Sequence, residues 1–181
     1  IVFAGHGGDT VNTGHGDNLV VGDSGALTVG VGLANLGSLP LELLTLTTTD
    51  ITVGGADLII TGLGEDIILG GAAGDTIDTG AAGLLSGVDS ADVVLGDHGF
   101  INWINVADGS TDFAREIETT DVLTGGDDSI TTAESNDIVL GGTGSDKIFS
   151  GAGNDLVLGD HGRLDGDIDE NVLPLYTGTL P

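Results

Sequence analysis

The sequence has no cysteine and only three basic residues among its 181, and each scarcity excludes a kind of chemistry. Without cysteine there is neither a disulfide framework nor thiol chemistry. Arg115, Lys147 and Arg163 are too few to form the basic footprint of a nucleic-acid-binding surface, so no nucleic-acid partner is expected. No apolar run approaches the length of about 18 residues that a membrane span needs, so none is predicted.

Proline and aromatic residues are also scarce, whereas 34 residues are glycine. Glycine without a three-residue period, beside only three prolines, excludes a collagen triple helix. The net charge is −26, yet 39% of the residues are hydrophobic, which a disordered acidic chain would not have. Aspartate outnumbers glutamate 23 to 6. Because aspartate favours turns and glutamate favours helices, a helical fold is not expected.

A nine-residue repeat organises most of the chain. Its pattern is G-G-x-G-x-D-x-U-x, in which U is a large apolar residue, and residues 141–149 (GGTGSDKIF) fit it fully. The aspartate position of the pattern, with an insertion allowed near residues 80–88, holds Asp9, Asn18, Asp57, Asp66, Asp75, Asp92, Asp128, Asp137, Asp146 and Asp155. Two residues after each of these stands a valine or an isoleucine, which predicts a short buried strand in every copy.

The turn half of the pattern suits a divalent cation of the calcium type. Glycines permit positive φ, so such a turn can direct carbonyl oxygens inward, and the aspartate adds a carboxylate to them. Ca²⁺ prefers six to eight oxygen ligands at about 2.3–2.6 Å. Besides the ten aspartate and asparagine positions, we expect carbonyl ligands from Gly142, Gly144, Gly151 and Gly153. The alternative is a metal-free solenoid in which aspartate only forms turns, but stacked unpaired carboxylates would repel one another there.

These motifs resemble the RTX (repeats-in-toxin, haemolysin-type) calcium-binding family over roughly two-thirds of the chain. The resemblance implies an all-β fold, a right-handed parallel β-roll or β-solenoid, with two nonapeptides in each coil. Such a roll stacks aspartates eighteen residues apart on one edge, so the expected calcium-bridging pairs are Asp57 with Asp75, Asp66 with Asp92, Asp128 with Asp146, and Asp137 with Asp155. It also implies a bacterial protein that is exported by a type I route and folds on Ca²⁺ outside the cell.

The repeats fall into blocks of two coils, each ending in a similar sequence: 20–27 (VVGDSGAL), 94–101 (VLGDHGFI) and 157–164 (VLGDHGRL). Leu27, Ile101 and Leu164 stand where the next aspartate is due, so we expect the calcium stack to stop at each of them. The aspartates of these endings are expected to cap the last site of each block: Asp23, Asp97 and Asp160. The predicted divisions are 1–27, 50–101 and 121–164 as β-roll blocks, with inserts at 28–49, 102–120 and 165–181.

The first two inserts read as β-hairpins or short strand excursions, with a short helix at residues 40–46 as the alternative for the first. The third insert is polar first and apolar later, and is expected to be partly disordered or to lead to a further block. In the even-numbered nonapeptides, the outward positions beside the buried residue are apolar: Ile67, Leu69, Val93, Leu95, Ile138, Leu140, Leu156 and Leu158. Inserts packed against this face are one explanation, and self-association into fibres through it is the other.

No catalytic site is predicted. His6 and His15 should lie on opposite edges of the roll, and His98 and His161 in equivalent surface turns too far apart to share a metal. No nucleophile motif accompanies them. We therefore expect a calcium-binding segment of a large secreted, extracellular or cell-surface structural protein, such as an adhesin, matrix or filament protein. The alternative is an export and folding module of a secreted protease or lipase. Ice binding is disfavoured because the outward threonines do not form a regular row.

Overall fold

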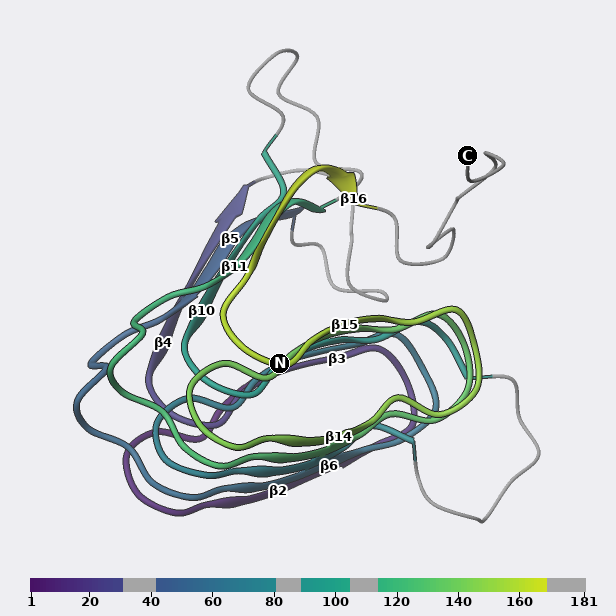
Figure 1. Ribbon diagram of the computed structural model, residues 1–181. Helices are drawn as coiled ribbons and strands as arrows, with labels where there is room; N and C mark the ends of the chain where they lie inside the picture. The colour runs from purple at the N-terminus through teal and green to yellow at the C-terminus, as the bar shows by residue number, and fades with distance from the viewer. Residues whose placement is uncertain (31–41, 81–88, 105–113, 169–181) are drawn as a thin grey trace, which may run out of the picture.

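The computed structural model describes residues 1–30, 42–80, 89–104 and 114–168. These residues form three β-sheets and no helix, so they contain none that is long and apolar enough to cross a membrane. Sheets A and B are stacked parallel sheets, and the antiparallel sheet C leaves them at one edge (Figure 1). The chain is therefore all-β, as its sequence predicts.

Sheets A and B are the two walls of a parallel β-roll, and the chain alternates between them. In spatial order, sheet A contains β1 (Val2–Phe3), β3 (Asn18–Val21), β7 (Asp66–Leu69), β9 (Val93–Leu95), β13 (Ile138–Leu140) and β15 (Leu156–Leu158). Sheet B contains β2 (Thr10–Gly14), β6 (Leu58–Thr61), β8 (Thr76–Asp78), β12 (Ser129–Thr131) and β14 (Lys147–Phe149). Even-numbered nonapeptides thus form sheet A and odd-numbered ones form sheet B.

The U residues of both sheets meet inside the roll. Because successive side chains of a strand point to opposite faces, one apolar residue in a three-residue strand is enough to line the interior. Ile59 is aligned with Ile77 in sheet B, and Ile68 with Val94 in sheet A. The resulting cluster is buried and consists of Val11, Val20, Ile59, Ile68, Ile77, Val94, Ile130 and Val139.

The roll continues without a break across the inserts. β3 pairs in parallel with β7 although the first insert separates them, and β8 and β9 pair with β12 and β13 across the second. Leu27, Ile101 and Leu164 belong to sheet C, and the strands that follow the first two inserts resume the same two parallel sheets. The roll therefore does not stop at Leu27 or Ile101, and the expected end of the calcium stack at the three residues stays a prediction.

Sheet C is built by the inserts. β4 (Gly25–Gly30) and β5 (Glu42–Thr48) form one antiparallel pair, β10 (Gly99–Asn102) and β11 (Ala114–Thr119) form the next, and β16 (Arg163–Ile168) adds to β11. The predicted hairpins are confirmed by these pairs. Because residues 42–48 are extended, the alternative helix is wrong over that stretch; residues 40 and 41 lie outside the described residues. The third insert begins as a strand, and residues 169–181 are likewise outside the description.

The apolar outer face of sheet A is covered by sheet C. Ile67, Leu69, Val93, Leu95, Ile138 and Leu140 are at most 7% exposed, with Leu156 and Leu158 partly buried against the same cluster. Sheet C contributes Leu43, Leu46, Ile101, Ala114 and Ile117 to it, and Trp103 joins it directly after β10. Of the two explanations offered for this face, packing of the inserts is correct. The face is not available for self-association, because intramolecular burial already removes its apolar surface from water.

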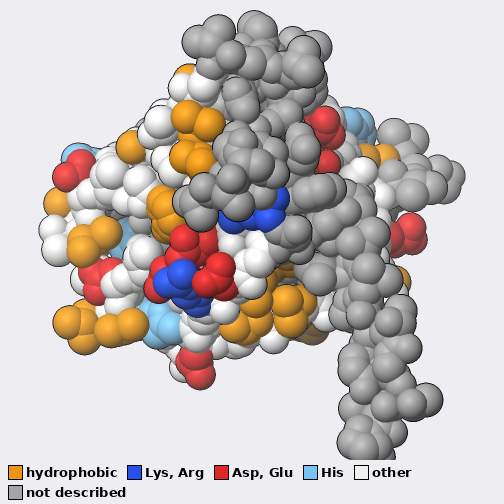
Figure 2. Space-filling view, turned by 90° about the horizontal axis from the view of Figure 1, so that it is seen from above, with side chains coloured by type: hydrophobic (Ala, Val, Ile, Leu, Met, Phe, Trp, Pro, Cys, Tyr) orange, Lys and Arg blue, Asp and Glu red, His pale blue; other side chains and the backbone are white. Residues whose placement is uncertain are grey.

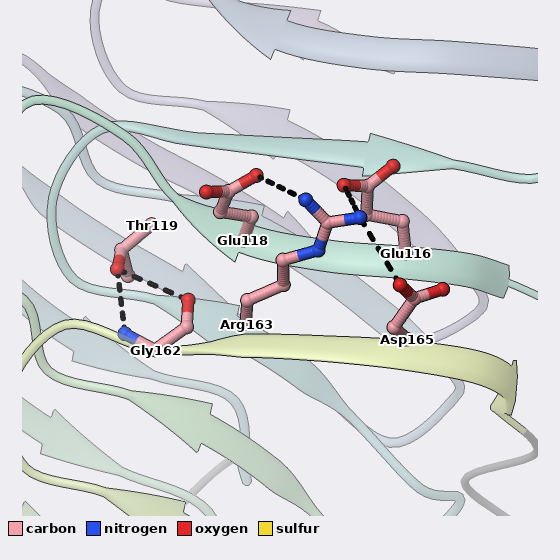
Figure 3. Close-up of polar contacts among 6 residues, drawn as sticks. All are labelled: Glu116, Glu118, Thr119, Gly162, Arg163 and Asp165. Atoms are coloured by element: carbon pink, nitrogen blue, oxygen red, sulfur yellow. Dashed lines mark hydrogen bonds and ion pairs between the residues drawn. The ribbon is translucent and has the colours of Figure 1, made fainter.

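A single arginine ties β16 to the strand beside it (Figure 3). The Arg163 guanidinium lies 2.9 Å from Glu116, 3.9 Å from Glu118 and 3.1 Å from Asp165. At the start of the strand, the Gly162 amide donates to the Thr119 hydroxyl at 2.9 Å. On the face shown in Figure 2, basic side chains lie beside acidic ones rather than in a patch of their own.

Replacing Leu46 by alanine tests whether the packing of sheet C on sheet A stabilises the protein. Leu46 is fully buried in the cluster between the two sheets. We expect L46A to lower the free energy of unfolding by about 2–5 kcal/mol, through lost apolar transfer and the cavity that remains. The measurement is urea denaturation in saturating Ca²⁺. L123A is the control: Leu123 is 85% exposed, so its effect should stay within about 0.5 kcal/mol. Equal effects of the two substitutions would contradict the packing role.

Candidate metal sites at the edges of the roll

Each coil has two turns, and the turns stack into two edges. The first edge holds the turns that lead from sheet A to sheet B, and the second holds the turns that lead back. The inserts that build sheet C leave the roll at the first edge. The repeat aspartates end these turns and divide equally: Asp9, Asp57, Asp75, Asp128 and Asp146 on the first edge, and Asn18, Asp66, Asp92, Asp137 and Asp155 on the second.

On both edges these residues form a continuous hydrogen-bonded ladder. Each backbone N–H donates to the Oδ1 atom of the aspartate in the next coil. On the first edge the distances from backbone N to Oδ1 are 2.7, 2.8, 2.7 and 3.0 Å, for the rungs Asp9–Asp57, Asp57–Asp75, Asp75–Asp128 and Asp128–Asp146. On the second edge the same distances are 2.9, 2.9, 3.0 and 3.2 Å, for the rungs Asn18–Asp66, Asp66–Asp92, Asp92–Asp137 and Asp137–Asp155. The four pairs expected from the spacing are rungs of these ladders, and further rungs cross the inserts.

The other oxygen of these carboxylates is left without a hydrogen-bond partner. Buried Oδ2 atoms with no partner belong to Asp9, Asp57, Asp66, Asp75, Asp92, Asp128, Asp137 and Asp146. Asp57, Asp75 and Asp128 are at most 3% exposed, so water cannot replace the missing partner freely. A buried carboxylate oxygen in this position needs a cation or a proton, because leaving it bare costs several kcal/mol.

Burial raises the pKa of these carboxyl groups far above the usual value for aspartate. Desolvation is the main cause, neighbouring carboxylates add to it, and the backbone N–H of the ladder opposes it. The pKa rises to about 9 for Asp75 and Asp92, to about 8 for Asp128, and to about 6 for Asp57 and Asp66. Metal-free folded protein would therefore hold protons on the deepest of these groups at neutral pH, whereas a bound divalent cation would keep them ionised.

Four glycines let the neighbouring coils approach closely beside the free oxygens of the first edge. They follow the strands of sheet A: Gly22, Gly70, Gly96 and Gly141. A Cβ atom on Gly22 would lie within 2.5 Å of both Asp57 Oδ2 and the Gly70 carbonyl oxygen. Gly70, Gly96 and Gly141 repeat this arrangement one coil at a time, with the Oδ2 atoms of Asp75, Asp128 and Asp146. Each of these glycines thus lies against a carboxylate oxygen and a carbonyl oxygen of the next coil, which are ligand types that Ca²⁺ prefers.

Within the described part of the chain, no three histidine or acidic side chains converge to form a metal cluster. A site held by side chains alone is therefore not found there. The donors that fit an ion are instead one carboxylate oxygen from the ladder together with carbonyl oxygens of the glycine turns. This mixed set of hard oxygens suits Ca²⁺, and it offers neither the nitrogen nor the sulfur ligands that zinc favours.

Asp23 and Asp97 accept backbone amides in the structure, and their predicted capping of a calcium site stays a prediction. Asp23 is fully buried, and its two carboxylate oxygens accept the amides of Gly55 at 3.2 Å and Ala72 at 2.6 Å. Asp97 likewise accepts the amides of Gly126 and Thr143. Both carboxylates therefore connect the segment returning from an insert to the turn of the following coil. Asp160, the third member of this set, is exposed.

The remaining predicted residues are divided between the two edges. Gly142 and Gly144 lie on the first edge with φ of 112° and 124°, and Gly151 and Gly153 lie on the second with φ of 75° and 159°. All four positions need glycine because φ is positive and the neighbouring coil lies close. Their carbonyl groups remain proposed ligands.

Histidine placement is confirmed in part. His6 lies 3.8 Å from Asp50 on the first edge, and His15 accepts the Leu63 amide on the second, as the nine-residue spacing predicts. His98 is fully buried with Nε2 3.0 Å from the Ile51 carbonyl oxygen, so the expected surface position is wrong. Its turn is covered by the segment that returns from the first insert, a long-range contact that spacing alone does not reveal.

Ala73 occupies the position of a repeat glycine and has a φ of 69°. A residue with a Cβ atom in this left-handed region costs about 1–2 kcal/mol, so A73G should raise the free energy of unfolding by about 1 kcal/mol. Urea denaturation in Ca²⁺ measures the change. A72G is the matched control: Ala72 is nearly buried and is not among the positive-φ residues, so losing its methyl group should destabilise the protein. A destabilising A73G would contradict the strain at this turn.

The fold and these edges define a calcium-binding β-roll, and comparison with known families places the repeats. Residues 51–82 and 122–157 match the family of the RTX calcium-binding nonapeptide repeat (4 copies). The chain therefore carries RTX calcium-binding nonapeptide repeats, and these repeats bind Ca²⁺. No curated protein and no solved structure matches the chain.

Proposed function

We propose that this chain is a segment of a large secreted bacterial structural protein, such as an adhesin, matrix or filament protein, whose β-roll folds on Ca²⁺ outside the cell. The observation that carries the proposal is the row of buried carboxylate oxygens without partners along the edges of an otherwise well-packed roll. The RTX repeats support a secreted bacterial origin, because that is where such repeats occur.

The proposed role of Ca²⁺ follows from the separation of charge and apolar residues in the fold. Apolar residues fill the roll and the space between sheets A and C, whereas carboxylates stack along the edges. At low Ca²⁺ these carboxylates repel one another across the short distance between coils. Millimolar Ca²⁺ outside the cell joins successive coils, and the free energy of binding becomes free energy of folding.

Sheet C supports a structural role over that of a compact export module. Hairpins leave the first edge at every second coil and join one antiparallel sheet, so the roll and its cover lengthen together. A repeating two-layer unit of this kind suits a long, stiff fibre or adhesin stalk. No described group forms a catalytic constellation, and the proposal assigns the segment no enzyme activity.

A Ca²⁺ titration of D146A, followed by far-ultraviolet circular dichroism, tests the proposal. Asp146 carries a buried Oδ2 atom without a partner, so its loss should raise the Ca²⁺ concentration at the folding midpoint by about tenfold, the effect of about 1.4 kcal/mol. D165A is the matched control, since Asp165 lies exposed on β16 of sheet C and its removal changes the net charge equally. An identical midpoint for both variants would argue against the ladder as the calcium ligand. Electron micrographs with and without Ca²⁺ then test fibre formation.

A further inference from the structure

Asp89 is a buried carboxylate of the second edge that does not occupy the aspartate position of the repeat. It stands third in a turn, residues 87–92, that reads GVDSAD where the repeat has GGxGxD. No other turn of the repeat carries aspartate in this third position. The residues that match the RTX repeat, 51–82 and 122–157, do not include Asp89. Its presence in the turn is therefore not explained by the repeat.

Hydrogen bonds from both neighbouring coils hold Asp89 in place. Its Oδ1 atom accepts the backbone amides of Gly64 and Ser90, each at 3.0 Å. Its carbonyl oxygen accepts the hydroxyl of Ser135 at 2.7 Å. Gly64 belongs to the turn of the preceding coil and Ser135 to the turn of the following one. Asp89 therefore bridges three successive coils, and its carboxylate is fixed on the side of the Gly64 turn.

The other carboxylate oxygen of Asp89 has no partner. Asp89 is 3% exposed, and its Oδ2 atom is buried without a hydrogen bond. Asp66 ends the Gly64 turn, is fully buried, and has a free Oδ2 atom of its own. The two carboxylates lie close enough to interact, since the charge of Asp89 raises the pKa of Asp66. Asp89 likewise raises the pKa of Asp137 on the following coil.

We propose that Asp89 is a calcium ligand additional to those of the repeat, and that it shares one ion of the second edge with Asp66. This proposal rests on the calcium-dependent function described above and names a further ligand for it. A proton on Asp89 would satisfy one oxygen and leave that of Asp66 bare, whereas one divalent cation neutralises both carboxylates. Because Ca²⁺ affinity depends on the number of charged ligands and on the rigidity of the site, this ion should bind more tightly than an ion held by one carboxylate.

A second acidic residue strengthens the negative field at this place. Glu134 has the same position in the turn of the following coil and is exposed. Its charge raises the pKa of Asp89, although burial contributes more to that shift and the exposed ring of His15 opposes it. Glu134 therefore favours a cation at Asp89 through its charge, without serving as a ligand.

Counting bound Ca²⁺ ions by native mass spectrometry tests the proposal on the full chain. D89N should bind one ion fewer than the parent protein, because asparagine keeps the acceptor for the Gly64 amide but removes the charge. D17N is the matched control and should keep the parent count, since Asp17 lies exposed on the same edge and accepts the Glu65 amide in the same way. S135A should also keep the count, because it removes only a hydrogen bond to the Asp89 backbone.

Equal counts for D89N and the parent protein, or the same loss in S135A as in D89N, would overturn the assignment of Asp89. If D89N does not fold in Ca²⁺, E134Q decides the question, because Glu134 is exposed and the variant should fold. E134Q should raise the free Ca²⁺ concentration for half-occupancy of one ion by about twofold relative to D17N. Equal titrations of E134Q and D17N would contradict the proposal. A parent protein that binds no Ca²⁺ would instead overturn the calcium-dependent function, so the two failures are distinguishable.

Discussion

Removal of Ca²⁺ with EDTA at neutral pH is expected to abolish the β-type circular dichroism of this protein. The buried ladder carboxylates lose their counter-ions, and each partnerless Oδ2 atom is then left buried without a donor. An ion present at one hundred times its dissociation constant contributes about 2.7 kcal/mol to folding, so three or four such ions reach the entire stability of a typical domain, about 5–15 kcal/mol.

Addition of excess Ca²⁺ should restore the spectrum, and the same concentration of Mg²⁺ should not. Mg²⁺ requires near-ideal octahedral geometry and gives up its water reluctantly, whereas carbonyls of a glycine turn offer the larger, more adaptable coordination of Ca²⁺. The midpoint of refolding against free Ca²⁺ measures the coupling directly. A chelated sample with an unchanged spectrum would show that the roll is stable as a metal-free solenoid, contrary to the proposed function.

Acidification of the chelated protein is expected to restore part of the β structure. The pKa values of Asp75 and Asp92 rise to about 9 in the folded protein, from a usual value of 3.8, mainly through burial. Folding without metal therefore takes up protons throughout the range from about pH 4 to about pH 9. The stability contributed by these protonated groups is fully present below pH 4. It is lost as the pH rises through the pKa values that the groups have in the folded protein. In EDTA, the β spectrum should thus be stronger near pH 4.5 than near pH 8.

Calcium binding should show the opposite dependence on pH. Protons and Ca²⁺ compete for the same carboxylate oxygens, so the Ca²⁺ midpoint should move to higher concentration as the pH falls. D75N is an informative variant, because asparagine resembles the protonated aspartate. The D75N substitution should weaken the pH dependence of the stability of the chelated protein, because it removes one carboxyl group whose pKa is strongly raised in the folded state. Greater stability of the chelated parent at pH 8 than at pH 5 would contradict this account.

The parallel roll can be predicted from the sequence because each copy of the repeat specifies its own turn and its own strand. Nine residues specify one turn and one strand: glycines for positive φ, an aspartate to end the turn, and a valine or isoleucine for the interior. Ile59 and Ile77, eighteen residues apart, are aligned for no reason beyond this repetition. The pairs Asp57–Asp75 and Asp128–Asp146 could be foreseen in the same way, since eighteen residues make one coil.

Features that depend on the inserts could not be foreseen so directly. Asp57 accepts the amide of Asp9 across 48 residues, and Asp75 is joined to Asp128 across 53, because each insert returns to the coil that it left. A count of residues cannot reveal such a return. The burial of Asp23, Asp97 and His98 is another consequence of it, since the returning segment covers their turns.

By itself, the sequence determined the class of fold, its repeating unit and the supply of carboxylates for Ca²⁺, because each of these is encoded within nine residues. The scarcity of cysteine, basic residues and long apolar runs already excluded thiol chemistry, a basic nucleic-acid surface and a predicted membrane span. Tertiary structure alone decided that the roll is continuous across the first two inserts and that sheet C covers sheet A. These features depend on which distant surfaces meet, and such contacts are selected by burial and shape rather than by spacing along the chain.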